Sequence, residues 1–83
     1  MNNERLIRAV TSDTTGVLKP ILDASYALEP VSKYDMLVIA EDVNKNLGYT
    51  LFEDLHYPRL VHDFALVTRA VQLNAIGGNI HDI

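Results

Sequence analysis

The helical pattern of this chain is clearest in residues 32–48, which read Ser32-Lys-Tyr-Asp-Met-Leu-Val-Ile-Ala-Glu-Asp-Val-Asn-Lys-Asn-Leu-Gly48. Apolar residues recur there at the i, i+3, i+4, i+7 and i+11 spacing that lines one face of a helix. These are Met36, Ile39, Ala40, Val43 and Leu47. Ser32 stands three residues before Asp35, which is a capping-box spacing with Asp in place of the usual Glu, and Gly48 suits the left-handed residue that ends a helix. The stretch therefore predicts a capped helix, although residues 36–40 alone could also form a buried strand.

Two segments upstream also have helical spacing. Residues 4–11 form the first, and a turn or capping cluster follows at residues 12–16. Residues 17–29 form the second. Its Pro20 is tolerated only in a first turn, because proline has no N–H and clashes with the preceding turn, and Pro30 ends the segment.

Downstream, Thr50 and Glu53 make a second capping-box spacing, which predicts a short turn ending near Tyr57. A long helix is expected over residues 58–75, with a proline at its first position and Gly77-Gly78 at its end.

These segments predict an all-α fold, a small helical bundle of three main helices plus short turns. Residues 1–76 are expected to form a single helical domain, and residues 77–83 a flexible C-terminal tail.

The last predicted helix is apolar on two sides. One stripe consists of Leu60, Phe64, Val67, Val71 and Ala75. Two further leucines lie almost opposite that stripe, so the helix is either central in the fold or shared with a partner. The expected partner-binding residues are Leu66, Leu73, Arg69 and Tyr57.

Composition limits the possible functions. The chain has 83 residues, 48% of them apolar, and no cysteine. A chain of this size buries only about 60–65% of its unfolded surface, so some apolar surface stays exposed unless a protein partner or a second copy covers it. Without cysteine, a disulfide-stapled scaffold and a thiolate zinc module are excluded.

Charge and hydropathy argue against two other kinds of partner. The 7 basic residues are scattered and outnumbered by 11 acidic ones, which does not favour direct binding to nucleic acid. The start lacks the pattern of a targeting segment, and the longest aliphatic run is far below the roughly 20 residues that cross a membrane. We therefore expect a cytoplasmic protein that does not bind membranes.

Residues 42–53 resemble an EF-hand calcium loop, with oxygen-bearing side chains at positions 1, 3, 5, 9 and 12. The weak calcium candidates are Asp42, Asn44, Asn46 and Glu53. The sixth position, which must be left-handed, is Leu47 instead of glycine. Helix caps explain the same residues more simply, so no metal site is expected.

No set of catalytic residues stands out. The pairs His62-Asp63 and His81-Asp82 resemble those of metal-dependent phosphohydrolases of the HD type, but the chain is too short for that helical bundle. There is no cysteine nucleophile, no Gly-x-Ser-x-Gly elbow and no Gly-rich phosphate loop after a strand. We expect a protein that is not an enzyme and that uses no cofactor.

The stretch from Lys33 to Val43 resembles the middle of the theta subunit of bacterial DNA polymerase III, which has a Tyr-x-Met-x-Val-Ile-Ala-Glu-x-Val segment. Residues 59–62 resemble the start of a later helical stretch of that family. The resemblance implies a three-helix bundle that binds and steadies the proofreading exonuclease subunit without catalysis. Leu37 stands where the family has proline, and the last helix lacks the family's cluster of arginines.

Together these features predict a non-catalytic protein–protein interaction module, either an accessory subunit similar to polymerase theta or a phage-type modulator of a host protein. Two alternatives remain open: a small self-assembling structural protein of the virion type, and a calcium-responsive module.

Overall fold

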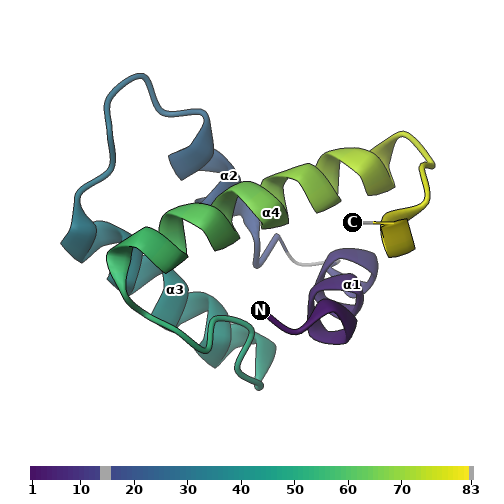
Figure 1. The fold of residues 1–83 in the computed structure, drawn as a ribbon, viewed down its shortest axis with the longest axis horizontal. Coiled ribbons are helices and arrows are strands. Elements are labelled where there is room, and N and C mark those ends of the chain that lie inside the picture. Colours follow the sequence, from purple (N-terminus) through teal and green to yellow (C-terminus); the bar gives the residue numbers. More distant parts are fainter. Residues whose placement is uncertain (14–15, 83) are drawn as a thin grey trace.

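The computed structural model describes residues 1–13 and 16–82, and within them the chain is all-α, as predicted. Its elements are α1 (Asn3–Ser12), α2 (Lys19–Ser25), α3 (Lys33–Leu47), α4 (Tyr57–Ala75) and the 3-10 turn η1 (Ile80–Asp82) (Figure 1). The described part thus has four α-helices, where three main helices were expected. None of these helices combines the length and the apolar character needed to cross a membrane.

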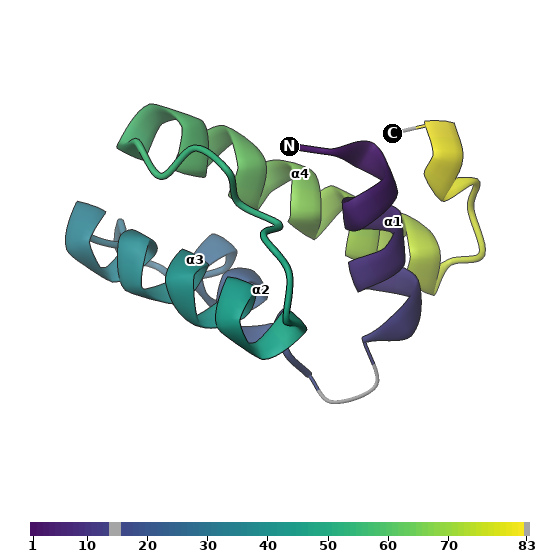
Figure 2. The ribbon, with the colours of Figure 1, turned by 90° about the horizontal axis from the view of Figure 1, so that it is seen from below.

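α4 lies at the centre of the bundle. α1, α2, α3 and η1 all pack against it (Figures 1 and 2). Leu60, Phe64 and Val67 of its main apolar stripe are buried, and Leu66 on the opposite side is half-buried against the core. This central position accounts for the two apolar sides of the helix.

Both predicted ends of α3 are confirmed. The Ser32 Oγ accepts a hydrogen bond from the Asp35 N–H at 3.1 Å, which satisfies one of the free donors of the first turn. At the other end Gly48 has φ 80°, and its N–H donates to the Asn44 carbonyl oxygen at 3.1 Å. A left-handed residue at this position costs little only when it is glycine, so the helix ends where the sequence indicates.

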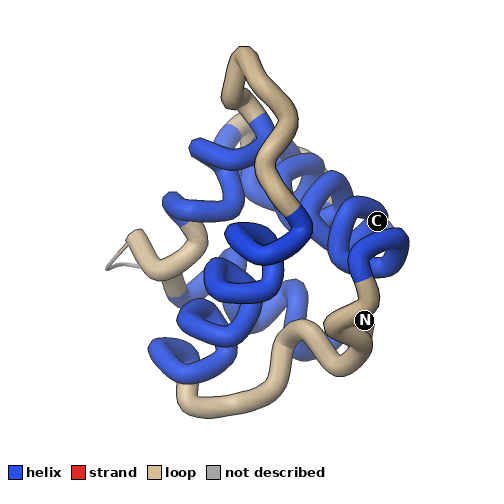
Figure 3. Tube along the Cα trace, turned by 90° about the vertical axis from the view of Figure 1, so that its left-hand side faces the viewer, coloured by secondary structure: helices blue, strands red, loops and turns tan. Residues whose placement is uncertain are grey.

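α2 is shorter than the predicted segment of residues 17–29. Its proline stands in the first turn as expected, but the helix ends at Ser25. Residues 26–32 then form a loop that projects from the bundle before α3 begins (Figures 1 and 3). Leu28 at the tip of this loop is fully exposed, at 103% of its reference surface. The second half of the segment therefore has no core to pack against, and periodicity alone does not sustain a helix.

The Asp13 carboxylate organises the entry to α2. It accepts hydrogen bonds from the N–H groups of Val17 at 2.8 Å and Leu18 at 3.3 Å. This agrees with the capping cluster expected at residues 12–16, of which Thr14 and Thr15 lie outside the described residues.

The short turn predicted at residues 50–57 does not form. α3 and α4 both run from left to right in Figures 1 and 2, although they diverge in Figure 1, so residues 48–56 lead back from the end of α3 to the start of α4. α3 has 15 residues, and a helix of that length spans about 22 Å. Only an extended segment covers that distance in so few residues, and Thr50 and Glu53 therefore cap no helix.

The core contains side chains from every helix and from the segment between α3 and α4. Its centre includes the aromatic pair Phe52 and Phe64, whose ring centroids are 5.3 Å apart at an interplanar angle of 58°. This tilted arrangement is one that aromatic rings favour. The other fully buried apolar residues include Leu6, Leu18, Ile21, Val43, Leu51, Leu60 and Val67.

Residues 77–82, which the sequence assigns to a C-terminal tail, turn back toward the bundle. Gly77 (φ 74°) donates its N–H to the Asn74 carbonyl oxygen, and Gly78 donates to the Leu73 carbonyl oxygen at 2.9 Å. This pair of bonds is a Schellman motif, which ends α4 and turns the chain back. η1 follows, and its Ile80 is buried in the core. Ile83 lies outside the described residues.

Candidate functional site

A groove with a volume of about 480 Å³ lies between the end of α2, the loop of residues 26–32 and one side of α4. We call it the α2–α4 groove. Most of its lining is apolar or aromatic, and the lining residues are Ala24, Ser25, Tyr26, Pro30, Val31, Met36, Tyr57, Val61, Phe64, Ala65, Thr68, Arg69 and Gln72. Its α4 residues recur at steps of three and four, because they share one side of the helix.

Polar contacts hold the two walls of the groove together. The Ser25 and Thr68 hydroxyls are hydrogen-bonded to each other at 2.8 Å, and Thr68 also donates to the Phe64 carbonyl oxygen of its own helix at 2.9 Å. Near the other end the Gln72 side-chain amide donates to the Tyr26 hydroxyl. Because these bonds join α2 and its following residue to α4, the groove has a defined width before anything enters it.

The charge of the groove differs from that of the whole protein. The chain carries a formal net charge of −4, with 11 carboxylates. No carboxylate lines the groove in the part of the chain that the structure describes, and Arg69 is its one charged lining residue. At the α4 start the Lys33 Nζ lies 5.2 Å from the centre of the Tyr57 ring, a cation–π distance. The groove is therefore apolar with a positive border.

The structure separates the four predicted partner-binding residues into two pairs. Tyr57 and Arg69 both line the α2–α4 groove. Leu66 is half-buried and packs against the core. Leu73 is half-buried as well, and the chain at Gly78 covers it, since a Cβ on Gly78 would lie 2.2 Å from the Leu73 Cδ1. The two leucines are thus occupied by contacts within the chain.

Most of the groove residues were not predicted as partner-binding residues. Val61 and Ala65 stand four residues apart on the exposed side of α4, and that spacing is the one signal that marks this side. Tyr26 lies within the segment that was expected to be helical, and Val31 directly follows the proline that ends it. No pattern in the sequence indicated that these two residues lie beside α4.

The calcium candidates do not form a loop. Asp42, Asn44 and Asn46 lie within α3, and Leu47 at the sixth position is helical too. The Glu53 carboxylate lies 3.2 Å from the Arg5 Nη1 in an ion pair. The candidates thus lie in a helix and in the segment after it, and they do not form the turn that an EF-hand requires.

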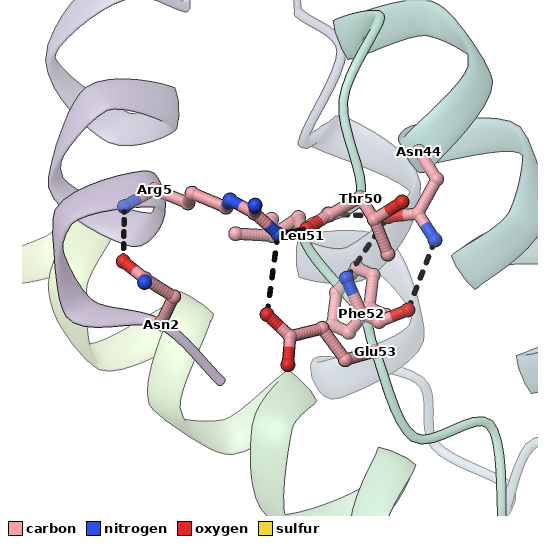
Figure 4. A network of polar contacts seen from close by, with 7 residues as sticks. All are labelled: Asn2, Arg5, Asn44, Thr50, Leu51, Phe52 and Glu53. Atoms are coloured by element: carbon pink, nitrogen blue, oxygen red, sulfur yellow. Dashed lines mark hydrogen bonds and ion pairs between the residues drawn. The ribbon is translucent and has the colours of Figure 1, made fainter.

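Asn44 organises the segment after α3. Its Oδ1 accepts hydrogen bonds from the N–H groups of Leu51 at 2.8 Å and Phe52 at 2.9 Å, and its Nδ2 donates to the Phe52 carbonyl oxygen at 3.1 Å (Figure 4). On the other side of the segment the Arg5 Nη1 donates to the Thr50 carbonyl oxygen at 2.9 Å. Since an extended segment has no internal hydrogen bonds, these side chains satisfy backbone groups that would otherwise lack partners.

Of the two predicted histidine–aspartate pairs, His62-Asp63 lies on α4, whereas the Asp82 side chain of the second pair lies outside the part that the structure describes. The Asp63 carboxylate is buried, and its Oδ1 lies 3.0 Å from the His62 Nδ1 and 3.3 Å from the Arg59 Nε. The Asp54 Oδ1 accepts from the His56 N–H at 2.9 Å and lies 2.8 Å from its ring Nδ1.

These contacts have one clear electrostatic effect. The hydrogen bond from the His56 backbone N–H, and after it the bond from the ring, holds the pKa of the Asp54 carboxyl below its ordinary value. Within residues 1–13 and 16–82, no three histidine, aspartate or glutamate residues come together as a group that could hold a metal ion.

None of the protein-family models, curated proteins or solved structures compared with this chain matches it.

Proposed function

We propose that the protein is a non-catalytic protein–protein interaction module and that the α2–α4 groove is its docking surface. The observation that carries this proposal is the composition of the groove, which is apolar and free of lining carboxylates on an otherwise acidic molecule. An apolar surface of this kind in contact with water is typical of a binding site.

The residues of the groove are suited to bind protein. Tyr26 and Tyr57 offer large aromatic surfaces with a polar end, and Arg69 offers a planar charged group. Tyrosine and arginine are the residue types enriched where interfaces are strongest. Val61 is 45% exposed beside them, so its burial by a partner would add apolar contact.

The finer form of the proposal is an accessory subunit similar to polymerase theta, or a phage-type modulator of a host protein. It is supported by the theta-like stretch, which forms the first eleven residues of α3 and leaves Tyr34 and Val38 exposed, at 73% and 37%. The partner that this resemblance implies is a proofreading exonuclease subunit. Isothermal titration calorimetry of the purified chain with such a subunit tests directly whether the two proteins bind.

Affinity capture with matched variants tests the docking surface. Ala65 is exposed and lines the groove, so Ala65→Arg fills the groove without disturbing the core. Asn46→Arg adds the same side chain to an exposed position of α3 outside the groove and serves as the control. We expect a partner that the wild type and Asn46→Arg retain and that Ala65→Arg loses. Equal capture by both variants would overturn the proposal.

A further inference from the structure

The loop of residues 26–32 exposes an apolar side chain that nothing in its own chain covers. Leu28 is 103% exposed, more than any other large apolar residue of the described part. Residues Ala27 and Glu29 beside it are exposed as well, so the tip presents a leucine with a carboxylate next to it. A leucine left in water forgoes the stabilisation that its burial would contribute.

The α2–α4 groove has the complementary chemistry. It combines an apolar lining with the Arg69 guanidinium, and no carboxylate lines it in the described part of the chain. Arg69 forms no ion pair with the described residues, whereas Arg5, Lys19 and Arg59 do. A segment that carries a leucine next to a carboxylate would therefore match both the apolar lining and the Arg69 guanidinium of the groove.

The tip and the groove also lie on one face of the molecule. Tyr26, Pro30 and Val31 of the same loop line the groove, so Leu28 stands at most two residues from a lining residue. Leu28 itself does not line the groove, because the loop projects away from the bundle (Figures 1 and 3). In an isologous dimer whose two-fold axis passes through this face, the tip of each copy would meet the groove of the other.

We infer that a second copy of this chain occupies the groove, with Leu28 of each copy inserted among the apolar lining residues of the other. Glu29 of each copy then pairs with Arg69 of the other. The inference rests on the proposed function of the α2–α4 groove as a docking surface and names its occupant. The site is shared, because each groove receives a loop from the other copy.

Sedimentation equilibrium from about 10 µM to about 1 mM, a range that covers weak association, tests the inference. We expect the wild type to dimerise reversibly. Leu28→Ser should weaken dimerisation at least about tenfold, because it removes about 1.5 kcal/mol or more of apolar burial. Ile76→Ser is the matched control, since Ile76 is 81% exposed just beyond α4 and does not line the groove. It should dimerise like the wild type.

Charge reversal tests the ion pair. Arg69→Glu and Glu29→Arg should each weaken the dimer, and the double variant should recover most of the wild-type affinity. All these side chains are exposed, so circular dichroism should show the wild-type helix content in every variant. Absence of recovery in the double variant would overturn the pairing of Glu29 with Arg69.

Two other results would overturn the whole inference: a wild type that is monomeric throughout, or a dimer that Leu28→Ser leaves intact. Neither decides the proposed function, which capture with Ala65→Arg tests separately. A monomeric protein that still loses a partner on Ala65→Arg retains the docking groove and rejects the second copy as its occupant.

Discussion

The side chain of Asn44 pairs with both backbone groups of Phe52. Its Oδ1 accepts from the Phe52 N–H at 2.9 Å, and its Nδ2 donates to the Phe52 carbonyl oxygen at 3.1 Å. One helix residue thus supplies the donor and the acceptor that a neighbouring strand would supply in a sheet. The extended segment between α3 and α4 is held in this way, and the Phe52 ring is directed against Phe64.

We predict that Asn44→Ala lowers the free energy of unfolding by about 2–3 kcal/mol, because it removes three hydrogen bonds and leaves partly buried backbone groups without partners. Urea denaturation followed by circular dichroism measures the change. Asn46→Ala, at an exposed position of the same helix, should change stability by less than about 0.5 kcal/mol. Equal effects of the two substitutions would contradict the role assigned to Asn44.

Gly78→Ala should destabilise the protein by about 1–3 kcal/mol, because the new Cβ overlaps the Leu73 side chain. The Cβ would lie 2.2 Å from the Leu73 Cδ1 and 2.9 Å from its Cγ. Thermal or urea unfolding of Gly78→Ala, Leu73→Ala and the double variant measures the coupling. In the Leu73→Ala background the cost of Gly78→Ala should fall by at least about 0.5 kcal/mol. Simple additivity would show that the two residues are not in contact.

Arg59→Ala should lower the free energy of unfolding by about 1–3 kcal/mol, since it removes the guanidinium that pairs with a buried carboxylate. Asp63 is only 1% exposed, and the Arg59 Nε lies 3.3 Å from its Oδ1. In an Asp63→Asn background the same substitution should cost less, because no buried charge is left unpaired. Chemical denaturation of all four proteins gives the comparison, and an equal cost in both backgrounds would reject the ion pair.

The Asp54 carboxyl should titrate below the ordinary aspartate pKa when followed by NMR. Since its pKa is lowered on folding, the carboxylate stabilises the folded state above the ordinary pKa, and this contribution is lost as the pH falls through the lowered value. His56→Ala should reverse only part of the shift, because the backbone N–H of residue 56 is the largest cause and the substitution retains it. A return to the ordinary value in His56→Ala would assign the whole shift to the ring.

The parts of the fold that depend on local chemistry could be read from the sequence. The Ser32 cap, the left-handed Gly48, the proline in the first turn of α2 and the glycine pair after α4 act within a few residues of themselves. Each of these features is where the sequence placed it.

The parts that depend on distant residues could not be read in this way. Thr50 and Glu53 have the spacing of a capping box, but both contact Arg5 of α1, 45 and 48 residues away. From its spacing Asn44 resembles a calcium ligand, but in the structure its side chain accepts hydrogen bonds from the N–H groups of residues 51 and 52. The groove needs α2, the following loop and α4 side by side, so the sequence revealed only Tyr57 and Arg69 of its lining.

The central position of α4 determines when the core can form during synthesis. α1, α2 and α3 leave the ribosome before α4, while the helix that covers Leu6, Ile21 and Val43 is still being synthesised. Apart from the contact between α2 and α3, these helices pack mainly against α4, and short helices are marginal in water when isolated. We therefore expect the core to close only once α4 has emerged, and the apolar faces of α1, α2 and α3 to stay exposed on the nascent chain until then.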